Sequence, residues 1–121
     1  MQLKLLEPRF SVCKLQNGEK IPYEDEFVFT GKTDEELSLV CPENKAPDQF
    51  LEREDGWRGF RIEGILDFSM IGVIAKISKL LADHEVGIFV ISTFHTDYVF
   101  VKEENWEKTV TLLKTNGYGI G

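Results

Sequence analysis

The sequence has few of the residues and motifs on which most catalytic and metal-binding functions depend. It contains only two cysteines, Cys13 and Cys41, and two histidines, His84 and His95. These are too few and too far apart for a disulfide framework or a zinc knuckle. The phosphate-binding loop, the dinucleotide-binding glycine pattern and the common protease and hydrolase motifs do not occur. We therefore expect no enzyme activity, no metal and no cofactor, and we interpret both cysteines as buried thiols in a reducing compartment.

Basic side chains and long apolar runs are also scarce. The chain has 14 Lys and Arg against 21 Asp and Glu, a net charge of −7, and residues 1–56 hold 7 basic and 13 acidic side chains. Such a chain gains little from phosphate, which argues against nucleic acid and anionic membrane surfaces. No run approaches the ~20 apolar residues of a membrane-spanning helix, and Glu7, Pro8 and Arg9 interrupt any signal peptide. The expected location is the cytoplasm.

Enough apolar residues are present for a packed core, at 42% of the chain with 29% charged. In the first half, short apolar runs predict strands over 3–6, 10–15, 27–30 and 37–41. Asn17-Gly18 and residues 31–34 are predicted turns. A helical turn is predicted over 22–26 and a weak helix over 46–55.

The second half has clearer periodicity. Residues 57–66 alternate between apolar and charged side chains, which predicts a strand with one covered face. Apolar residues then recur at helical spacing from Met70 to Leu81, with a cap at Asp67 or Ser69. Residues 86–93 are almost continuously apolar and predict a central strand that pairs with residues 98–101. A second helix begins near Asn105, and residues 118–120 form a last strand.

This order is βαββαβ, the ferredoxin-like unit. The first half has a weaker version of the same order. We therefore predict an α+β protein of two ferredoxin-like units in tandem. Residues 1–56 form a degenerate unit and residues 57–121 a complete one.

Four segments resemble the ACT domain family, small ligand-binding modules that regulate amino-acid metabolism. They are closer to its CASTOR-type branch and that branch's bacterial relatives of unknown function. The matching segments are Thr33–Ser38, Trp57-Arg58, Gly64–Ser69 and Ser92–Tyr98. The resemblance covers nearly the whole chain and is strongest over 57–104. The animal members are arginine sensors with four such units, whereas this chain has two at most.

The resemblance implies an amino acid bound where two units meet. Carried over to this sequence, the ligand-binding positions are Ser38, Leu39, Asp67, Ser69, Met70, Ile71, Gly72, Thr93, Phe94 and Asp97. The hydroxyl of Thr96, in the same turn, adds a further candidate. The residues themselves favour a small zwitterion: a helix N-terminus attracts a carboxylate, and a carboxylate in the facing turn attracts an ammonium group.

Each of these positions also has an interpretation without a ligand. Gly72 either leaves room for a ligand carboxylate or permits close packing of the helix on a strand. Asp97 either binds an ammonium group or bonds the backbone of its own turn. The hydroxyls of Ser69, Thr93 and Thr96 either reach a carboxylate or serve as caps and turn residues, and Asp67 suits a helix cap. Phe94 is a lid over the ligand or an interface aromatic.

We therefore expect a non-catalytic amino-acid sensor. Ligand binding would stabilise one arrangement of the two units or of a homodimer, and a regulated protein partner would be of unknown identity. The alternative is a structural module that dimerises without a ligand. An enzyme would need a clustered pair of titratable groups that the sequence does not reveal.

Overall fold

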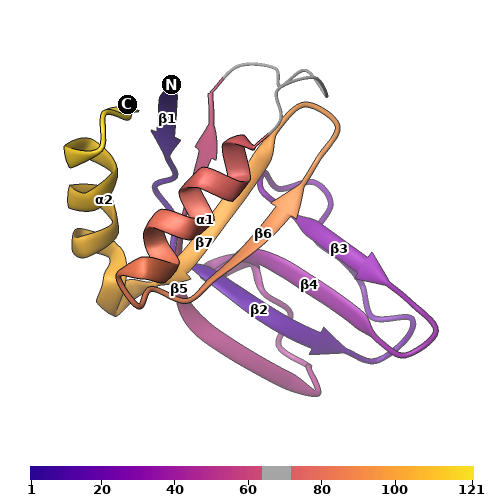
Figure 1. Cartoon of the computed structure of the whole chain (residues 1–121). Helices are drawn as coiled ribbons and strands as arrows, with labels where there is room; N and C mark the ends of the chain where they lie inside the picture. Colours follow the sequence, from indigo (N-terminus) through magenta and orange to yellow (C-terminus); the bar gives the residue numbers. More distant parts are fainter. Residues whose placement is uncertain (64–71) are drawn as a thin grey trace. The chain divides into compact units, whose positions relative to one another are not determined.

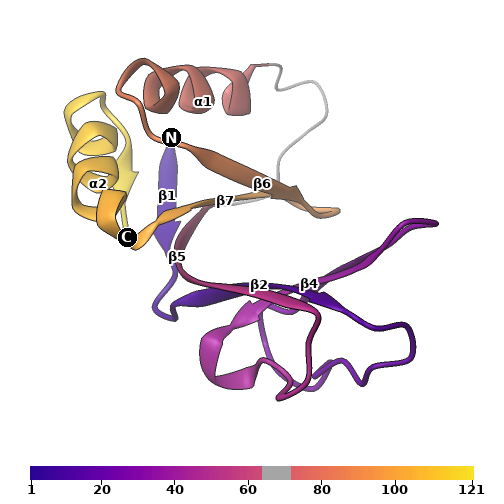
Figure 2. The same ribbon diagram turned by 90° about the horizontal axis from the view of Figure 1, so that it is seen from below.

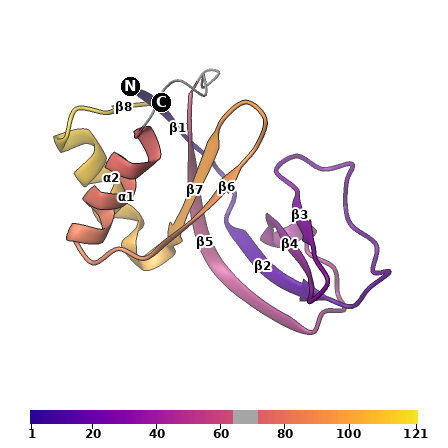
Figure 3. The same ribbon diagram turned by 45° about the vertical axis from the view of Figure 1, so that its right-hand side comes forward.

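The computed structural model describes residues 1–63 and 72–121. The chain divides into two compact units, drawn in Figure 1. Unit 1 consists of Met1–Glu7 and Arg58–Gly121, and unit 2 consists of Pro8–Trp57. The strand β5 (Glu52–Ile62) belongs to both, because its first residues pair in unit 2 and its last residues pair in unit 1. Figure 3 shows β5 as one long strand.

Unit 1 has the element order that the sequence predicts. After β5 come α1 (Val73–Asp83), β6 (Ile88–Ser92), β7 (Asp97–Lys102), the short 3₁₀ helix η2 (Glu103–Asn105), α2 (Trp106–Thr115) and β8 (Gly119–Ile120). The strands lie in the order β6-β7-β5-β1-β8, where β1 is Gln2–Leu5. Both helices cover the same face of these strands (Figures 1 and 2). The α+β, ferredoxin-like fold expected from the sequence is confirmed.

The first strand lies in a different unit from the one assigned by sequence. β1 is antiparallel to β5 and parallel to β8, so it lies between the first and last strands of the βαββαβ unit. Leu3 is completely buried in the core of unit 1, and the Leu6 N–H donates to the Gly59 carbonyl at 2.9 Å. Burial of apolar side chains among those of β5 and the helices therefore holds residues 1–7 in unit 1.

The periodic residues of the second half form the core of unit 1. Phe60 and Ile62 are fully buried, whereas Arg61 between them is half-buried, as the alternation predicts. Ile77 and Leu81 of α1 pack into the same core. The helix begins at Val73, however, and the predicted start at Met70 lies outside the described residues.

β6 is an edge strand, and the prediction that it is central is wrong. Among the described residues it pairs with β7 alone. Its apolar side chains are used on both faces: Ile88 packs against the core, and Phe89 stacks on Phe100 with ring centroids 4.8 Å apart. Val90 stays 36% exposed. The continuous apolar run of β6 therefore arises because both faces of the strand make apolar contacts. It does not require a neighbouring strand at each edge.

Unit 2, all of which is described, is a four-stranded antiparallel arrangement without an α-helix. β3 (Phe29–Lys32), β4 (Leu37–Pro42), β2 (Phe10–Leu15) and the start of β5 lie side by side in that order, and η1 (Glu43–Lys45) is a single 3₁₀ turn. Its buried core consists of Cys13, Leu15, Leu37, Leu39 and Cys41.

The weak helix predicted over 46–55 is wrong, whereas the single turn predicted at 22–26 is present as one hydrogen-bonded turn, in which the Asp25 N–H donates to the Pro22 carbonyl at 3.1 Å. Residues 52–54 are in β5, opposite Lys14, Cys13 and Val12 of β2. Pairing with a strand distant in sequence overrides the weak local preference for helix. β3 starts two residues later than predicted, after Phe27, whose φ of 60° is incompatible with a strand. No helix within residues 1–63 and 72–121 is long and apolar enough to span a membrane.

Candidate functional site

Three segments lie toward the same end of unit 1, and two of them carry predicted ligand-binding residues. They are the end of β5, the start of α1 and the turn between β6 and β7 (Figures 1 and 3). Thr96, which is 9% exposed, ties two of them together, because its hydroxyl donates to the Ile62 carbonyl at 2.7 Å. Asp67, Ser69, Met70 and Ile71, which were also predicted, lie outside the described residues.

Gly72 immediately precedes α1 rather than lying within its first turn. It is the N-cap residue, with φ of 87° and ψ of 4°, and its carbonyl accepts the N–H of Lys76 at 2.9 Å. No side chain among the described residues caps this helix. The first N–H groups of a helix have no partner within the helix, so the start of α1 offers donors and a partial positive charge.

The backbone conformation explains this glycine without reference to packing. A Cβ built on Gly72 would meet no heavy atom of the described residues within 4 Å, so the predicted alternative of close helix–strand packing is not supported. A positive φ of this size is one that residues with a Cβ rarely adopt. Glycine at this position is required by the turn into the helix, whether or not a ligand also approaches it.

The turn between β6 and β7 is held by its two threonines. The Thr93 N–H and the Thr93 hydroxyl both donate to the Thr96 carbonyl, at 2.8 and 3.0 Å. Both threonine hydroxyl protons are therefore used inside unit 1, since that of Thr96 goes to Ile62. The hydroxyl oxygens keep lone pairs, so these groups are suited to accept from an ammonium group rather than to donate to a carboxylate.

Asp97 begins β7 directly opposite Ser92, the last residue of β6. The Ser92 hydroxyl donates to its carboxylate at 2.5 Å, and this is its only hydrogen bond to the described residues. The predicted alternative, a bond to the backbone of its own turn, is therefore not what the structure shows. Phe94 at the tip of the turn is 85% exposed and makes an edge contact with the His95 ring, so it covers nothing within unit 1.

Ser38 and Leu39 are in β4 of unit 2. Leu39 is fully buried in the core of unit 2, so its side chain contributes to stability there. Ser38 is opposite Lys14, which is itself opposite Glu52 of β5. Ser38 also lines a hollow of about 640 Å³, the β-face hollow, together with Val12, Cys13, Lys14, Glu36, Glu52, Arg53 and Glu54.

The charged residues that line the β-face hollow were not predicted from the sequence as a cluster. The sequence could have shown that Val12 and Lys14 lie on the same face of their strand, because side chains two residues apart on a strand point the same way. Recognising Glu52 as the neighbour of Lys14 would have required the pairing of β2 with β5. The Ser38 hydroxyl donates to Glu36 beside it.

The cysteines and histidines do not form a reactive centre. Burial raises the pKa of the Cys13 thiol and raises that of Cys41 to about 11, so both stay protonated at neutral pH and are weak nucleophiles. His84 is at the end of α1, where Nδ1 lies 2.9 Å from the Leu80 carbonyl oxygen. The described residues contain no group of three or more His, Cys, Asp and Glu side chains that could hold a metal ion.

Unit 1 is thus a ferredoxin-like domain in which a helix start and a polar turn lie toward the same end, and small regulatory modules belong to this class of fold. The family model of the ACT domain matches residues 52–115, and a separate model of an N-terminal domain matches residues 8–49. The chain belongs to the ACT domain family.

Several solved structures are similar over nearly the whole chain. A protein from Agrobacterium tumefaciens is 32% identical, with a TM-score of 0.86 over 99% of this chain and 91% of that one. A Vibrio cholerae protein of unknown function, described as a possible transport protein, is 21% identical over 92% and 85%, with a TM-score of 0.74. The allosteric aspartate kinase of Clostridium acetobutylicum is 16% identical over 90% of this chain and 33% of its own, with a TM-score of 0.66. The last two share the fold alone.

Proposed function

We propose that the protein is a non-catalytic regulatory module that binds a small amino acid at the end of unit 1. What supports the proposal is that the start of α1 and the β6–β7 turn lie toward the same end of unit 1, where the Thr96–Ile62 hydrogen bond of 2.7 Å ties the turn to the end of β5. Membership of the ACT domain family supports a ligand-binding role.

The two ends of the site suit the two charges of a zwitterion. The α-carboxylate would be bound by N–H groups at the start of α1, after Gly72, where the helix dipole favours an anion. The α-ammonium would be bound by Asp97, with the Thr93 hydroxyl oxygen as a neutral acceptor. The Thr93 hydroxyl proton is already donated to the Thr96 carbonyl, which supports a contact of this oxygen with the ammonium group rather than with the carboxylate.

The other ligand-binding positions predicted from the sequence, which lie before Gly72 or in unit 2, stay predictions. Asp67, Ser69, Met70 and Ile71 would follow the end of β5 and precede the carboxylate-binding N–H groups. Ser38 and Leu39 would act from unit 2, Leu39 through its backbone because its side chain is buried.

Thermal unfolding in the presence of each of the twenty amino acids tests the proposal. A ligand at a hundred times its Kd stabilises the folded state by about 2.7 kcal/mol, a shift of several degrees. Asp97→Ala should abolish the shift and change the apo melting temperature little, because it removes one cross-strand contact at a partly exposed site. The matched control is Asp83→Ala, an exposed carboxylate at the other end of α1 that pairs with Lys79 at 2.9 Å, and it should keep the full shift.

No shift with any amino acid at millimolar concentration would contradict the proposal. A shift that Asp97→Ala leaves intact would show that the ligand binds elsewhere.

One observation favours the alternative of a dimerisation module. β6, with the sequence I-F-V-I-S, carries no charged residue, and among the described residues it pairs on one side only. Edge strands usually carry charges or proline that prevent pairing with another chain. A homodimer through β6 would be detected by light scattering, and Val90→Lys should convert it to a monomer. Ligand-independent dimerisation without any thermal shift would favour this function over amino-acid binding.

A further inference from the structure

Two strands connect unit 1 with unit 2. The first strand leaves unit 1 after Glu7 and enters unit 2 at Pro8, and β5 leaves unit 2 after Trp57 and enters unit 1 at Arg58. We name these four residues the junction. None of them belongs to the site proposed for the amino acid. Any change in the orientation of the two units must pass through the junction, so its construction decides whether the units can move.

The ladder of backbone pairs between the two connecting strands is irregular at the junction. The last pair on the unit 1 side is Leu5 opposite Phe60, and the first pair on the unit 2 side is Phe10 opposite Trp57. Between these pairs lie four residues of the first strand but only two of β5, so the first strand has two residues in excess. Excess residues interrupt a ladder locally and let the strand bend.

β5 has an irregularity of its own, one step further into unit 2. Between the pairs Phe10–Trp57 and Val12–Glu54 lie one residue of β2 and two of β5, so here the excess residue is in β5. Gly56 lies in this bulge with a φ of 82°. A bulge with a left-handed glycine bends its strand and increases the local twist. Both connecting strands are therefore irregular close to the junction.

Glu43 anchors both connecting strands on the unit 2 side. Its N–H donates to the Arg9 carbonyl at 2.9 Å, and its carboxylate accepts the Gly56 N–H at 2.8 Å. One residue of η1 thus holds the first strand just after the junction and β5 just before it.

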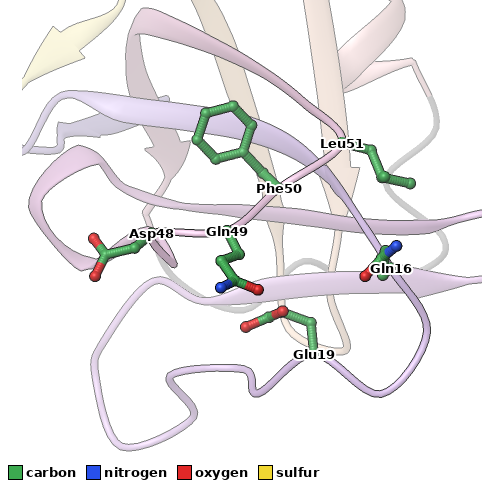
Figure 4. A pocket seen from close by; sticks show the side chains of 6 residues that line it. All are labelled: Gln16, Glu19, Asp48, Gln49, Phe50 and Leu51. Carbon is green, nitrogen blue, oxygen red and sulfur yellow. The ribbon is translucent and has the colours of Figure 1, made fainter.

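The segment between η1 and β5 is also fixed to unit 2. The Leu51 N–H donates to the Lys14 carbonyl of β2 at 2.7 Å. Residues 48–51 lie beside the turn after β2 and, together with Gln16 and Glu19, line a hollow of about 340 Å³ (Figure 4). Unit 2 is therefore braced on both strands up to the junction.

Arg58 anchors β5 on the unit 1 side. Its guanidinium carbon lies 4.9 Å from the centre of the Trp106 ring, and its Nη1 lies 3.5 Å from a carboxylate oxygen of Glu103. Both partners belong to unit 1, so these contacts hold the start of this part of β5 against η2 and α2. The first strand is anchored on this side by the Leu6 N–H, which donates to the Gly59 carbonyl at 2.9 Å.

We propose that the junction is a hinge about which the two units change their relative orientation. Each connecting strand is anchored on both sides of the junction, and the ladder is irregular between the anchors. Backbone rotation then concentrates in the few residues between the anchored ends, as in other hinges. Pro8 limits the range of the motion, because its ring fixes its own φ and restricts Glu7 to extended backbone. Arg58 and Glu43 are positioning residues that set the two ends of the hinge.

A hinge at this place can couple ligand binding to the arrangement of the units. An amino acid that contacts both units would restrict the hinge, and a restricted hinge would in turn strengthen binding. This consequence rests on the proposed function, whereas the hinge itself does not.

Residual dipolar couplings of the backbone amides in the full, ligand-free chain test the hinge. The couplings of each unit are fitted separately to the structure of that unit, so the comparison does not depend on the angle between the units. Motion of one unit against the other averages the alignment of the less aligned unit, and such couplings include motions up to the millisecond range in which domain hinges move. The two alignment tensors should therefore differ in magnitude. Tensors of equal magnitude and rhombicity would show a single rigid body and overturn the proposal.

Replacement of Arg58 tests where the hinge lies. Arg58→Met keeps most of the apolar stem but removes the guanidinium, so it should increase the difference between the two tensors. The matched control is Arg61→Met in the same strand, which removes a similarly exposed guanidinium that pairs with Glu63 at 3.3 Å. The control should leave the difference unchanged. A loss of melting temperature in Arg58→Met without any change in the tensors, or equal changes in both variants, would overturn this placement of the hinge.

A second variant acts on the other connecting strand. Pro8→Gly frees one φ and should also increase the difference between the tensors, whereas Pro47→Gly, between η1 and β5, should not. An equal response to both substitutions would contradict a hinge at Pro8.

The hinge and the proposed function fail separately. Equal tensors in the ligand-free protein overturn the hinge whether or not an amino acid binds. Absence of a thermal shift with every amino acid contradicts the proposed function whether or not the tensors differ.

Discussion

Replacement of Gly72 by alanine shows whether this residue lies inside helix α1 or just before it. The two positions predict opposite changes in the free energy of unfolding. If Gly72 were inside the first helical turn, as the sequence suggests, alanine would stabilise the protein by about 1 kcal/mol. In the structure Gly72 precedes the helix with φ of 87°, in the left-handed region. There a Cβ costs about 1–2 kcal/mol, partly offset by the smaller entropy of the unfolded chain. We therefore expect Gly72→Ala to destabilise the protein by about 1 kcal/mol.

No steric clash contributes to this expectation, because the space around the added Cβ is open among the described residues. The effect comes from backbone conformation alone. Gly72→Asn should lose less stability than Gly72→Ala, since asparagine tolerates left-handed φ better than other residues with a Cβ.

Urea unfolding monitored by far-UV circular dichroism measures the difference. A loss of about 1 kcal/mol would lower the melting temperature by about 4 °C in a chain of this size. The matched control is Gly87→Ala, also in unit 1 and also with open space around its Cβ, but without a left-handed φ. Gly87→Ala should be neutral or slightly stabilising. A Gly72→Ala variant at least as stable as the unchanged protein would refute the reasoning about this turn.

Two further predictions concern buried polar groups. Thr96→Val should destabilise the protein by about 1–3 kcal/mol, because it leaves the Ile62 carbonyl without its donor. Thr109→Val should stabilise the protein by about 1 kcal/mol, because the buried Thr109 hydroxyl has no partner among the described residues. The same urea experiment measures both changes. Equal effects of the two variants would contradict this assignment. Burial raises the pKa of Cys41 from 9.0 to about 11, so the thiol of the unfolded chain loses its proton at a lower pH than the thiol of the folded protein. The free energy of unfolding should therefore fall by about 2–3 kcal/mol between pH 9 and pH 11. Cys41→Val should make this fall smaller. An unchanged slope in the variant would show that other groups dominate.

Much of the candidate site was predictable from sequence because it consists of local signals. The polar turn at 93–97 between two apolar runs is evident in the sequence, and so is the helix that ends near His84. The roles of individual residues were less accessible. The partner of the Thr96 hydroxyl is the carbonyl of Ile62, on a different strand, and the partner of Asp97 is Ser92, which depends on the register of the hairpin.

The sequence by itself determined which residues are apolar, with what period, and therefore the βαββαβ order and the ACT domain family. Periodicity reports which face of an element is covered, because side chains alternate along a strand and recur every few residues along a helix. It does not report which strand is the neighbour. Only the tertiary structure decided that β1 lies between β5 and β8, that β6 is at an edge, and that residues 52–55 extend a strand. Those outcomes depend on hydrogen bonds and packing between segments distant in the chain, which local propensity does not encode.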